Sequence, residues 1–120
     1  MFYDFFWHDG LLIKVNFDFE HHEECTITLI LELYESNQSE ARERYSLKLY
    51  KVTSFNGNLD TVQLSDNVLA GNIIDAHLRE RDHSKLKAVR FFFTDGYFDV
   101  THEYIEIKKL DIKTNNQEGK

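Results

Sequence analysis

Apolar and polar residues alternate with a period of two along much of the chain. In residues 11–19 every odd position is apolar, and in residues 25–33 the odd positions are apolar again. Such alternation is typical of a β-strand that buries one face. Joining the two stretches through a loop at residues 20–24 places Phe17 opposite Ile27, so that the apolar faces coincide. The pattern therefore predicts an antiparallel hairpin.

A third alternating stretch, residues 45–49, follows a polar segment at residues 35–43. The polar segment is expected to form an exposed loop. The alternation predicts a strand that pairs with the second one in a meander, continues toward Phe55 and ends at residues 56–58. These strands have one apolar and one polar face, as an antiparallel sheet with one solvated surface should.

The pattern changes in the next region. Residues 59–71 contain apolar residues at helical spacing, with Ser65 as a candidate N-cap and Gly71 as a stop signal, which predicts one short helix. Residues 72–80 fit two templates, a strand that buries Ile74 or the continuation of a helical face. The alternation is cleaner than the helical spacing, so a strand is preferred.

The C-terminal part, residues 86–112, predicts a long β-hairpin closed by Asp95-Gly96, because Asp-Gly suits the two positive-φ positions of a type I′ turn. A loop of these two residues alone pairs Phe93 with Phe98. Apolar positions then shift from even to odd, which predicts a β-bulge around residues 102–104. The inward face of the hairpin carries Val89, Phe91, Phe93, Phe98 and Val100.

The opposite face of this hairpin departs from the polar pattern. It carries Phe92 and Tyr97 beside Arg90 and Asp99. Aromatic residues among charged ones are typical of the cores of protein interfaces. These four residues are therefore candidate binding residues, unless another part of the chain covers them.

The N-terminal segment is a candidate for that cover, because five aromatic residues lie within the first seven positions. Phe2, Phe5 and Trp7 are expected to fold over the face of Phe92 and Tyr97. In the alternative arrangement they pack across an open edge of the sheet and leave this face to a second chain.

A turn signal follows these aromatic residues. His8, Asp9 and Gly10 are expected to turn the chain into the first strand, with Asp9 in an Asx-turn and Gly10 at a strained backbone angle. A metal-binding or acid–base role of His8 and Asp9 is the less favoured alternative.

Together these elements predict a mainly all-β fold, either a curved antiparallel sheet or a sandwich or half-barrel, of about six strands with one short helix. Residues 1–113 are expected to form one domain, and residues 114–120 a frayed polar tail. The predicted core contains Ile13, Val15, Phe17, Ile27, Leu29, Leu31, Leu47, Leu49, Phe91, Phe93 and Val100.

Composition narrows the possible functions. The formal net charge is −7, from 21 acidic and 14 basic side chains. Such a surface repels phosphate backbones, so nucleic-acid binding is not expected, and it suits either solubility alone or a basic protein partner. The single cysteine excludes an internal disulfide. No signal peptide and no apolar run of roughly 20 residues is present, which predicts a cytoplasmic protein without a membrane span.

Catalytic motifs are not found in the sequence. Adjacent residues of a loop point in different directions, so no metal site is expected at the cluster of potential zinc ligands His21, His22, Glu23, Glu24 and Cys25. No Gly-x-Ser-x-Gly motif and no glycine-rich phosphate loop occurs. A cofactor is therefore not expected, and no residue pattern supports an enzyme.

Several short patterns together resemble a known group of proteins. Residues 6–10 (FWHDG) lead into an alternating strand, Asp66-Asn67-Val68 follows two more strands, and an Asp-Gly hairpin ends the domain. This arrangement resembles small β-rich immunity-like proteins of bacterial polymorphic toxin systems. The resemblance implies an intracellular protein that binds and blocks a cognate toxin without catalysis. It also implies a set of candidate binding residues, namely Trp7, His8, Asp9 and Asn67.

A binder of small apolar ligands is the competing class, because a curved, aromatic-rich sheet can enclose a pocket, as in lipocalin-like barrels. The inward residues are almost all bulky Leu, Ile, Val and Phe. Bulky side chains leave little space for a ligand, so a filled core and a protein partner are preferred. The sequence leaves the oligomeric state open.

Overall fold

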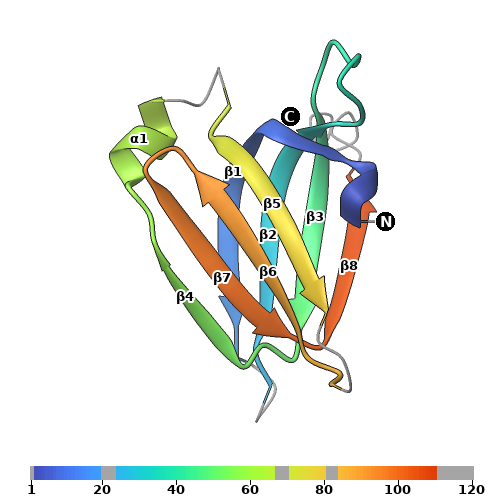
Figure 1. The fold of residues 1–120 in the computed structure, drawn as a ribbon, viewed down its shortest axis with the longest axis vertical. Helices are drawn as coiled ribbons and strands as arrows, with labels where there is room; N and C mark the ends of the chain where they lie inside the picture. Colours follow the sequence, from blue (N-terminus) through green and yellow to red (C-terminus); the bar gives the residue numbers. More distant parts are fainter. Residues whose placement is uncertain (1, 20–23, 67–70, 81–83, 111–120) are drawn as a thin grey trace, which may run out of the picture.

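Two four-stranded antiparallel sheets pack face to face, accompanied by one short helix (Figure 1). The computed structural model describes residues 2–19, 24–66, 71–80 and 84–110. The first sheet, in the order β1-β2-β3-β8, contains β1 (Phe6–Asp18), β2 (Thr26–Tyr34), β3 (Glu43–Tyr50) and β8 (Tyr104–Lys109). The second sheet, in the order β4-β7-β6-β5, contains β4 (Ser54–Asn58), β7 (Gly96–His102), β6 (Lys87–Phe93) and β5 (Ile73–Glu80).

The predicted mainly all-β fold with one short helix is confirmed, and of the predicted alternatives the structure is the sandwich. It has eight strands instead of about six. The additional strands arise because two of the predicted long strands are each divided between the sheets. The predicted polar tail, residues 114–120, lies outside the described residues.

The first division follows β3. The predicted continuation of this strand toward Phe55 is wrong, because the chain leaves the first sheet at Lys51, whose φ is 54°, and enters the second sheet as β4. Gly57 was expected near the end of the strand but instead pairs with Phe98 of β7. A Cβ atom at Gly57 would lie 2.4 Å from the carbonyl oxygen of Tyr97, so glycine permits this close pairing.

The second division explains the phase change after β7. The predicted bulge around residues 102–104 is not formed, since β7 ends at His102 and β8 begins at Tyr104 in the other sheet. Between them, the backbone N–H of Glu103 donates a hydrogen bond to the carbonyl oxygen of Tyr50 on β3 (3.0 Å). Inward positions change from even to odd because the chain moves to the opposite side of the core.

The turn between β6 and β7 is placed one residue earlier than predicted. Thr94 and Asp95 form the loop, and Phe91, not Phe93, pairs with Phe98. Only Asp95 among the turn residues has a positive φ, 57°. Gly96 is needed for another reason, since its Cβ atom would lie 2.5 Å from the carbonyl oxygen of Asn58 on β4. The register moves by two residues in total, so every side chain keeps its predicted face.

The hairpin of β1 and β2 has the predicted register, with Phe17 opposite Ile27. Residues 72–80 form the preferred strand, β5, but a bulge lies between Ile73 and Asp75. The bulge turns Ile73 into the core and leaves Ile74 49% exposed, so the predicted burial of Ile74 is wrong.

The predicted helix is present as α1 (Thr61–Asp66). Its N-cap is Asp60 and not Ser65, because the Asp60 carboxylate accepts hydrogen bonds from the backbone N–H groups of Val62 and Gln63 (both 3.1 Å). A short 3-10 helix, η1 (Phe2–Asp4), precedes β1. Among the described residues, no helix is long and apolar enough to cross a membrane.

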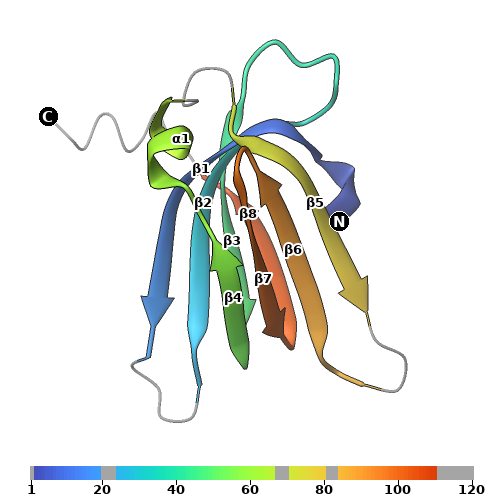
Figure 2. The same ribbon diagram turned by 60° about the vertical axis from the view of Figure 1, so that its left-hand side comes forward.

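Large apolar side chains fill the space between the sheets. The buried residues of the sheets include Ile27, Leu29, Leu31, Leu33, Leu47, Leu49, Val89, Phe91, Phe93, Phe98 and Val100. Two predicted core residues are wrong, since Ile13 and Phe17 are 41% and 42% exposed, and a third, Val15, is only half-buried against the core. They lie on β1, which forms one edge of the first sheet (Figure 2).

The N-terminal segment closes one open side of the sandwich. Trp7 is buried, stacks on Phe2 with ring centroids 4.6 Å apart, and meets the ring of Phe91 edge to face at 5.5 Å. Phe91 points into the core, so the preferred prediction that these aromatic residues cover Phe92 and Tyr97 is wrong. The alternative, packing across an open edge, describes the structure.

Candidate functional site

The outward-facing residues of the second sheet form a regular array, here called the outer face. Strand register sets them in three cross-strand rows. The first row is Asp75, Phe92, Tyr97 and Asn58, the second is His77, Arg90, Asp99 and Asn56, and the third is Arg79, Ala88, Thr101 and Ser54. Four candidate residues from the sequence, Arg90, Phe92, Tyr97 and Asp99, occupy the centre of this array.

Arg90 and Asp99 form a two-pronged ion pair in the middle row. Nη2 of Arg90 lies 2.7 Å from Oδ2 of Asp99, and Nε hydrogen-bonds to Oδ1. The guanidinium carbon lies 5.8 Å from the ring centre of Phe92 and 5.7 Å from that of Tyr97. The hydrogen bonds to Asp99 raise the pKa of Arg90. This fork geometry fixes the guanidinium close to the rings of Phe92 and Tyr97.

A second polar pair lies on β5. Nε2 of His77 is 3.1 Å from Oδ2 of Asp75, and the other carboxylate oxygen of Asp75 accepts a hydrogen bond from the backbone N–H of Ala76 (2.8 Å). The imidazole of His77 also meets the ring of Phe92 edge to face, with centroids 5.9 Å apart. His77 therefore links the charged residues of β5 to the aromatic residues of β6 and β7.

A hollow of about 490 Å³ lies on the outer face. It forms because the third row has the small side chains of Ala88, Thr101 and Ser54, while Phe92 and Arg90 in the other rows are large. The remaining lining residues are Asn56, His77, Arg79 and Asp99. Arg79 is exposed and forms no ion pair with the residues that the structure describes. The hollow thus offers the guanidinium of Arg79, neutral hydrogen-bonding groups and one aromatic wall.

This arrangement is suited to binding a polar or aromatic group. Two arginines can hold a carboxylate or a main-chain carbonyl oxygen, and Phe92 and Tyr97 provide flat apolar surface. Within the described residues, no group of three or more His, Cys, Asp or Glu side chains is placed to hold a metal ion.

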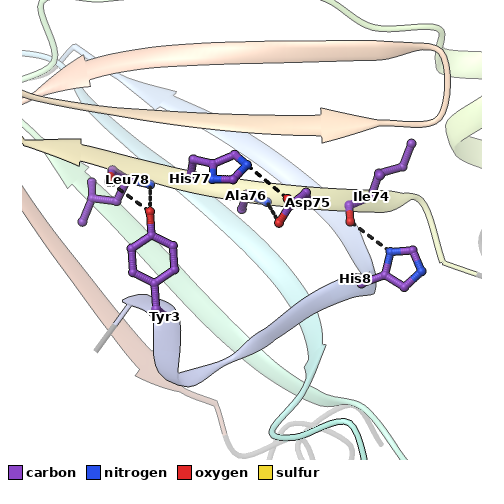
Figure 3. A network of polar contacts seen from close by, with 7 residues as sticks. All are labelled: Tyr3, His8, Ile74, Asp75, Ala76, His77 and Leu78. Carbon is purple, nitrogen blue, oxygen red and sulfur yellow. Dashed lines mark hydrogen bonds and ion pairs between the residues drawn. The ribbon is translucent and has the colours of Figure 1, made fainter.

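His8, a candidate residue near the N-terminus, lies elsewhere, along the outer edge of β5 together with Tyr3 (Figure 3). Nδ1 of His8 is 3.0 Å from the carbonyl oxygen of Ile74. The hydroxyl of Tyr3 donates to the carbonyl oxygen of Leu78 (3.0 Å) and accepts from its backbone N–H (2.8 Å). These side chains occupy backbone groups that a further strand would otherwise pair with.

The segment of His8, Asp9 and Gly10 is a bulge inside β1 and not a turn before it. The register shifts by three residues between Phe6 and Leu11, and Asp9 has a φ of 65°. The predicted Asx-turn and the strained angle at Gly10 are therefore wrong. Asp9 packs against Gly71, where a Cβ atom would lie 2.5 Å from the Asp9 carbonyl oxygen. The positions of Trp7, His8 and Asp9 are explained by folding alone.

Asn72 is an important residue that the sequence reasoning missed. It is buried, and its side-chain oxygen accepts from the backbone N–H of Leu12 (3.0 Å) while its amide donates to the carbonyl oxygen of Leu64 (3.3 Å). Its backbone bonds to Gly10 and Thr94. Asn72 thus ties together both sheets and the helix. No local pattern marks it, because its partners are distant in sequence.

Some candidate residues lie outside the described residues. They are Asn67 and, from the cluster of potential zinc ligands, His21, His22 and Glu23. Cys25, the last member of the predicted cluster, is half-buried, and this burial raises the pKa of its thiol.

Comparisons with known proteins identify no relative. No family model matches the chain, and no curated protein and no solved structure matches it.

Proposed function

We propose that this protein is a non-catalytic binding protein that holds a protein partner on the outer face, as an immunity-like inhibitor holds its toxin. The observation that carries the proposal is the central group of Phe92, Arg90 and Tyr97, in which the guanidinium lies within 6 Å of both ring centres. Tyrosine and arginine are enriched among the residues that dominate the binding energy of protein interfaces.

The side chains of this group are held in fixed positions, which supports binding further. Arg90 is held by Asp99 and by the two rings before any partner arrives. Side chains already fixed in position lose little entropy on binding, so their contacts contribute more to affinity. Tyr97 is 40% exposed, which leaves its ring accessible to a partner.

The charge distribution suggests how a partner approaches. The chain carries a net charge of −7, whereas on the outer face Asp75 and Asp99 balance Arg79 and Arg90. A basic partner is attracted by the acidic molecule as a whole. At the contact itself, Arg79 in the hollow is suited to a carboxylate or carbonyl oxygen of that partner.

Capture of the partner from host lysate on immobilised protein tests the proposal, with inhibition of that partner's toxic activity as the second readout. Tyr97→Ala and Arg90→Ala should each weaken binding by roughly tenfold or more. Lys48→Ala is the matched control, because Lys48 lies between buried Leu47 and Leu49 and faces away from the core on the first sheet. Equal binding by all three variants would refute the proposed face.

A second candidate function, binding of a small apolar ligand, is favoured by one observation. A hollow of about 420 Å³ lies between β1 and α1, with Leu12, Ile13, Val15, Leu59 and Leu64 among its lining residues. An environment-sensitive apolar dye should become fluorescent there, and Leu64→Arg should abolish the signal. A signal that survives Leu64→Arg would place the dye elsewhere.

A further inference from the structure

β1 is an edge strand with exposed apolar side chains. It lies at one end of the first sheet, and among the described strands it pairs with β2 alone (Figure 2). On its inward side, Phe17 is 42% exposed and Phe19, which follows the strand, is 70% exposed; their rings stack with centroids 6.3 Å apart. A flat edge strand with exposed apolar residues is a template for pairing with another chain.

The edge of β5, in contrast, is covered by side chains that bond to its backbone. There, side chains of Tyr3, His8 and Asp75 bond to the outward backbone groups of three successive outward positions (Figure 3). On β1, the side chain of Asn72 bonds to Leu12, before the bulge that shifts the register between Leu12 and Lys14. For residues 14–17, no such side-chain bond to the backbone is found among the described residues. One edge is protected and the other is open.

The segment centred on Asn16 is self-complementary. Residues 14–18 pair regularly with β2 and have the sequence Lys-Val-Asn-Phe-Asp, with Asn16 at the centre. In an antiparallel pairing of two copies centred on Asn16, Lys14 of one copy lies opposite Asp18 of the other. On the apolar side, Val15 lies opposite Phe17 of the second copy. Opposite charges and an aromatic residue with a β-branched residue are both favourable cross-strand pairs.

We propose that a second copy of this chain docks on β1, forming a two-fold symmetric dimer in which the two first sheets join into one continuous eight-stranded sheet. The regular segment fits this symmetry, because Asn16 lies midway between the bulge after Leu12 and the end of β1 at Asp18. Self-pairing repeats each favourable contact twice, as the two-fold axis requires. The interface uses β1 and is separate from the outer face of the second sheet.

Charge exchange tests the predicted register. Lys14→Asp alone and Asp18→Lys alone each place like charges opposite each other twice, which should weaken dimerisation by about tenfold. The double variant restores opposite charges and should restore the dimer. Sedimentation equilibrium from about 1 µM to about 1 mM covers the affinities expected of a small interface. A monomer at every concentration, or a dimer that the single variants leave unchanged, would overturn the proposal.

Disulfide trapping tests the same register without relying on charge. In a Cys25→Ser background, Asn16→Cys places two thiols directly opposite each other, at the roughly 4.5–5.5 Å Cα separation that disulfides accept. Thr28→Cys is the matched control, since Thr28 is the neighbour of Asn16 on β2 and would lie about 14 Å from its copy. Mild oxidation should therefore cross-link the Asn16→Cys protein alone. Equal cross-linking of both variants would rule out this pairing.

Discussion

At the scale of single residues, Phe91 lies at the centre of the aromatic contacts in the core. It is fully buried, and its ring contacts the rings of Trp7, Phe93 and Phe98 with centroids 5.1–6.1 Å apart. Phe91→Ala should lower the free energy of unfolding by about 3–5 kcal/mol, because it removes this contact area and leaves a cavity. Phe92→Ala, one position away on the outer face, is the control. Urea unfolding of both variants measures the difference, and similar losses would mean that the two faces are assigned wrongly.

His102 is a residue whose environment predicts a dependence of stability on pH. Its side chain is fully buried between the sheets, and neither ring nitrogen has a hydrogen-bond partner among the described residues. Burial lowers the pKa of His102 below the usual value of 6.5; the polar backbone of Tyr104 opposes this shift without reversing it, and the nearby charge of Lys87 adds to the lowering. Above pH 6.5 the imidazole is neutral in both states, so its protonation makes no difference to stability. As the pH falls below 6.5, the unfolded chain binds a proton that the folded chain does not, and the free energy of unfolding decreases.

Replacement of His102 isolates this contribution. His102→Leu removes the titrating group and an unpartnered polar group, so it should raise the free energy of unfolding by about 1 kcal/mol or more at neutral pH. The advantage over the wild-type protein should grow as the pH falls from 6.5 toward the lowered pKa. Urea unfolding at several pH values gives this difference, in which the contributions of all other titrating groups cancel. A difference that stays constant with pH would contradict the explanation.

At the scale of elements, the alternation of apolar and polar residues was sufficient to predict which strand face a residue lies on. It did not predict which of the two sheets a strand joins. The register of Phe17 with Ile27 followed from matching two apolar faces across a short loop. The crossings at Lys51 and Glu103 could not be predicted, because they depend on which distant strands pair. Asp95 and Gly96 were recognised as a turn, but the approach of β4 to Gly96 decided the register. Local chemistry thus specifies the strands, and long-range pairing specifies their order.

The protected edge of β5 gives a prediction at this scale. Tyr3→Phe removes the hydroxyl that bonds to both backbone groups of Leu78, which should cost roughly 1 kcal/mol of stability. The amide of Leu78 should also exchange its hydrogen faster in hydrogen–deuterium exchange. Tyr104→Phe is the control, because Tyr104 is exposed and its hydroxyl has no hydrogen bond among the described residues. Unchanged exchange at Leu78 would show that the hydroxyl does not protect this edge.

At the scale of the whole molecule, the candidate site is assembled from segments that are far apart in sequence. Arg90, Phe92, Tyr97 and Asp99 could be predicted together because one hairpin carries them all. The hollow could not be predicted, since β4 and β5 supply the rest of its lining and their neighbours in the sheet were unknown. A surface of this kind becomes visible only when strand order is known.

The net charge of −7 leads to a prediction about the rate of association with a basic partner. Long-range attraction accelerates the encounter, and salt screens charges beyond about 10 Å at 0.1 M ionic strength. The association rate constant should therefore fall by roughly tenfold or more between low and high salt, whereas the dissociation rate constant should change much less. Stopped-flow fluorescence with the captured partner measures both constants. Glu106 is exposed on β8 of the first sheet, away from the proposed contact. Glu106→Gln should therefore slow association slightly and leave the dissociation rate constant unchanged. An association rate that is independent of salt would remove the steering argument while leaving the proposed contact on the outer face to be judged by the Tyr97 and Arg90 variants.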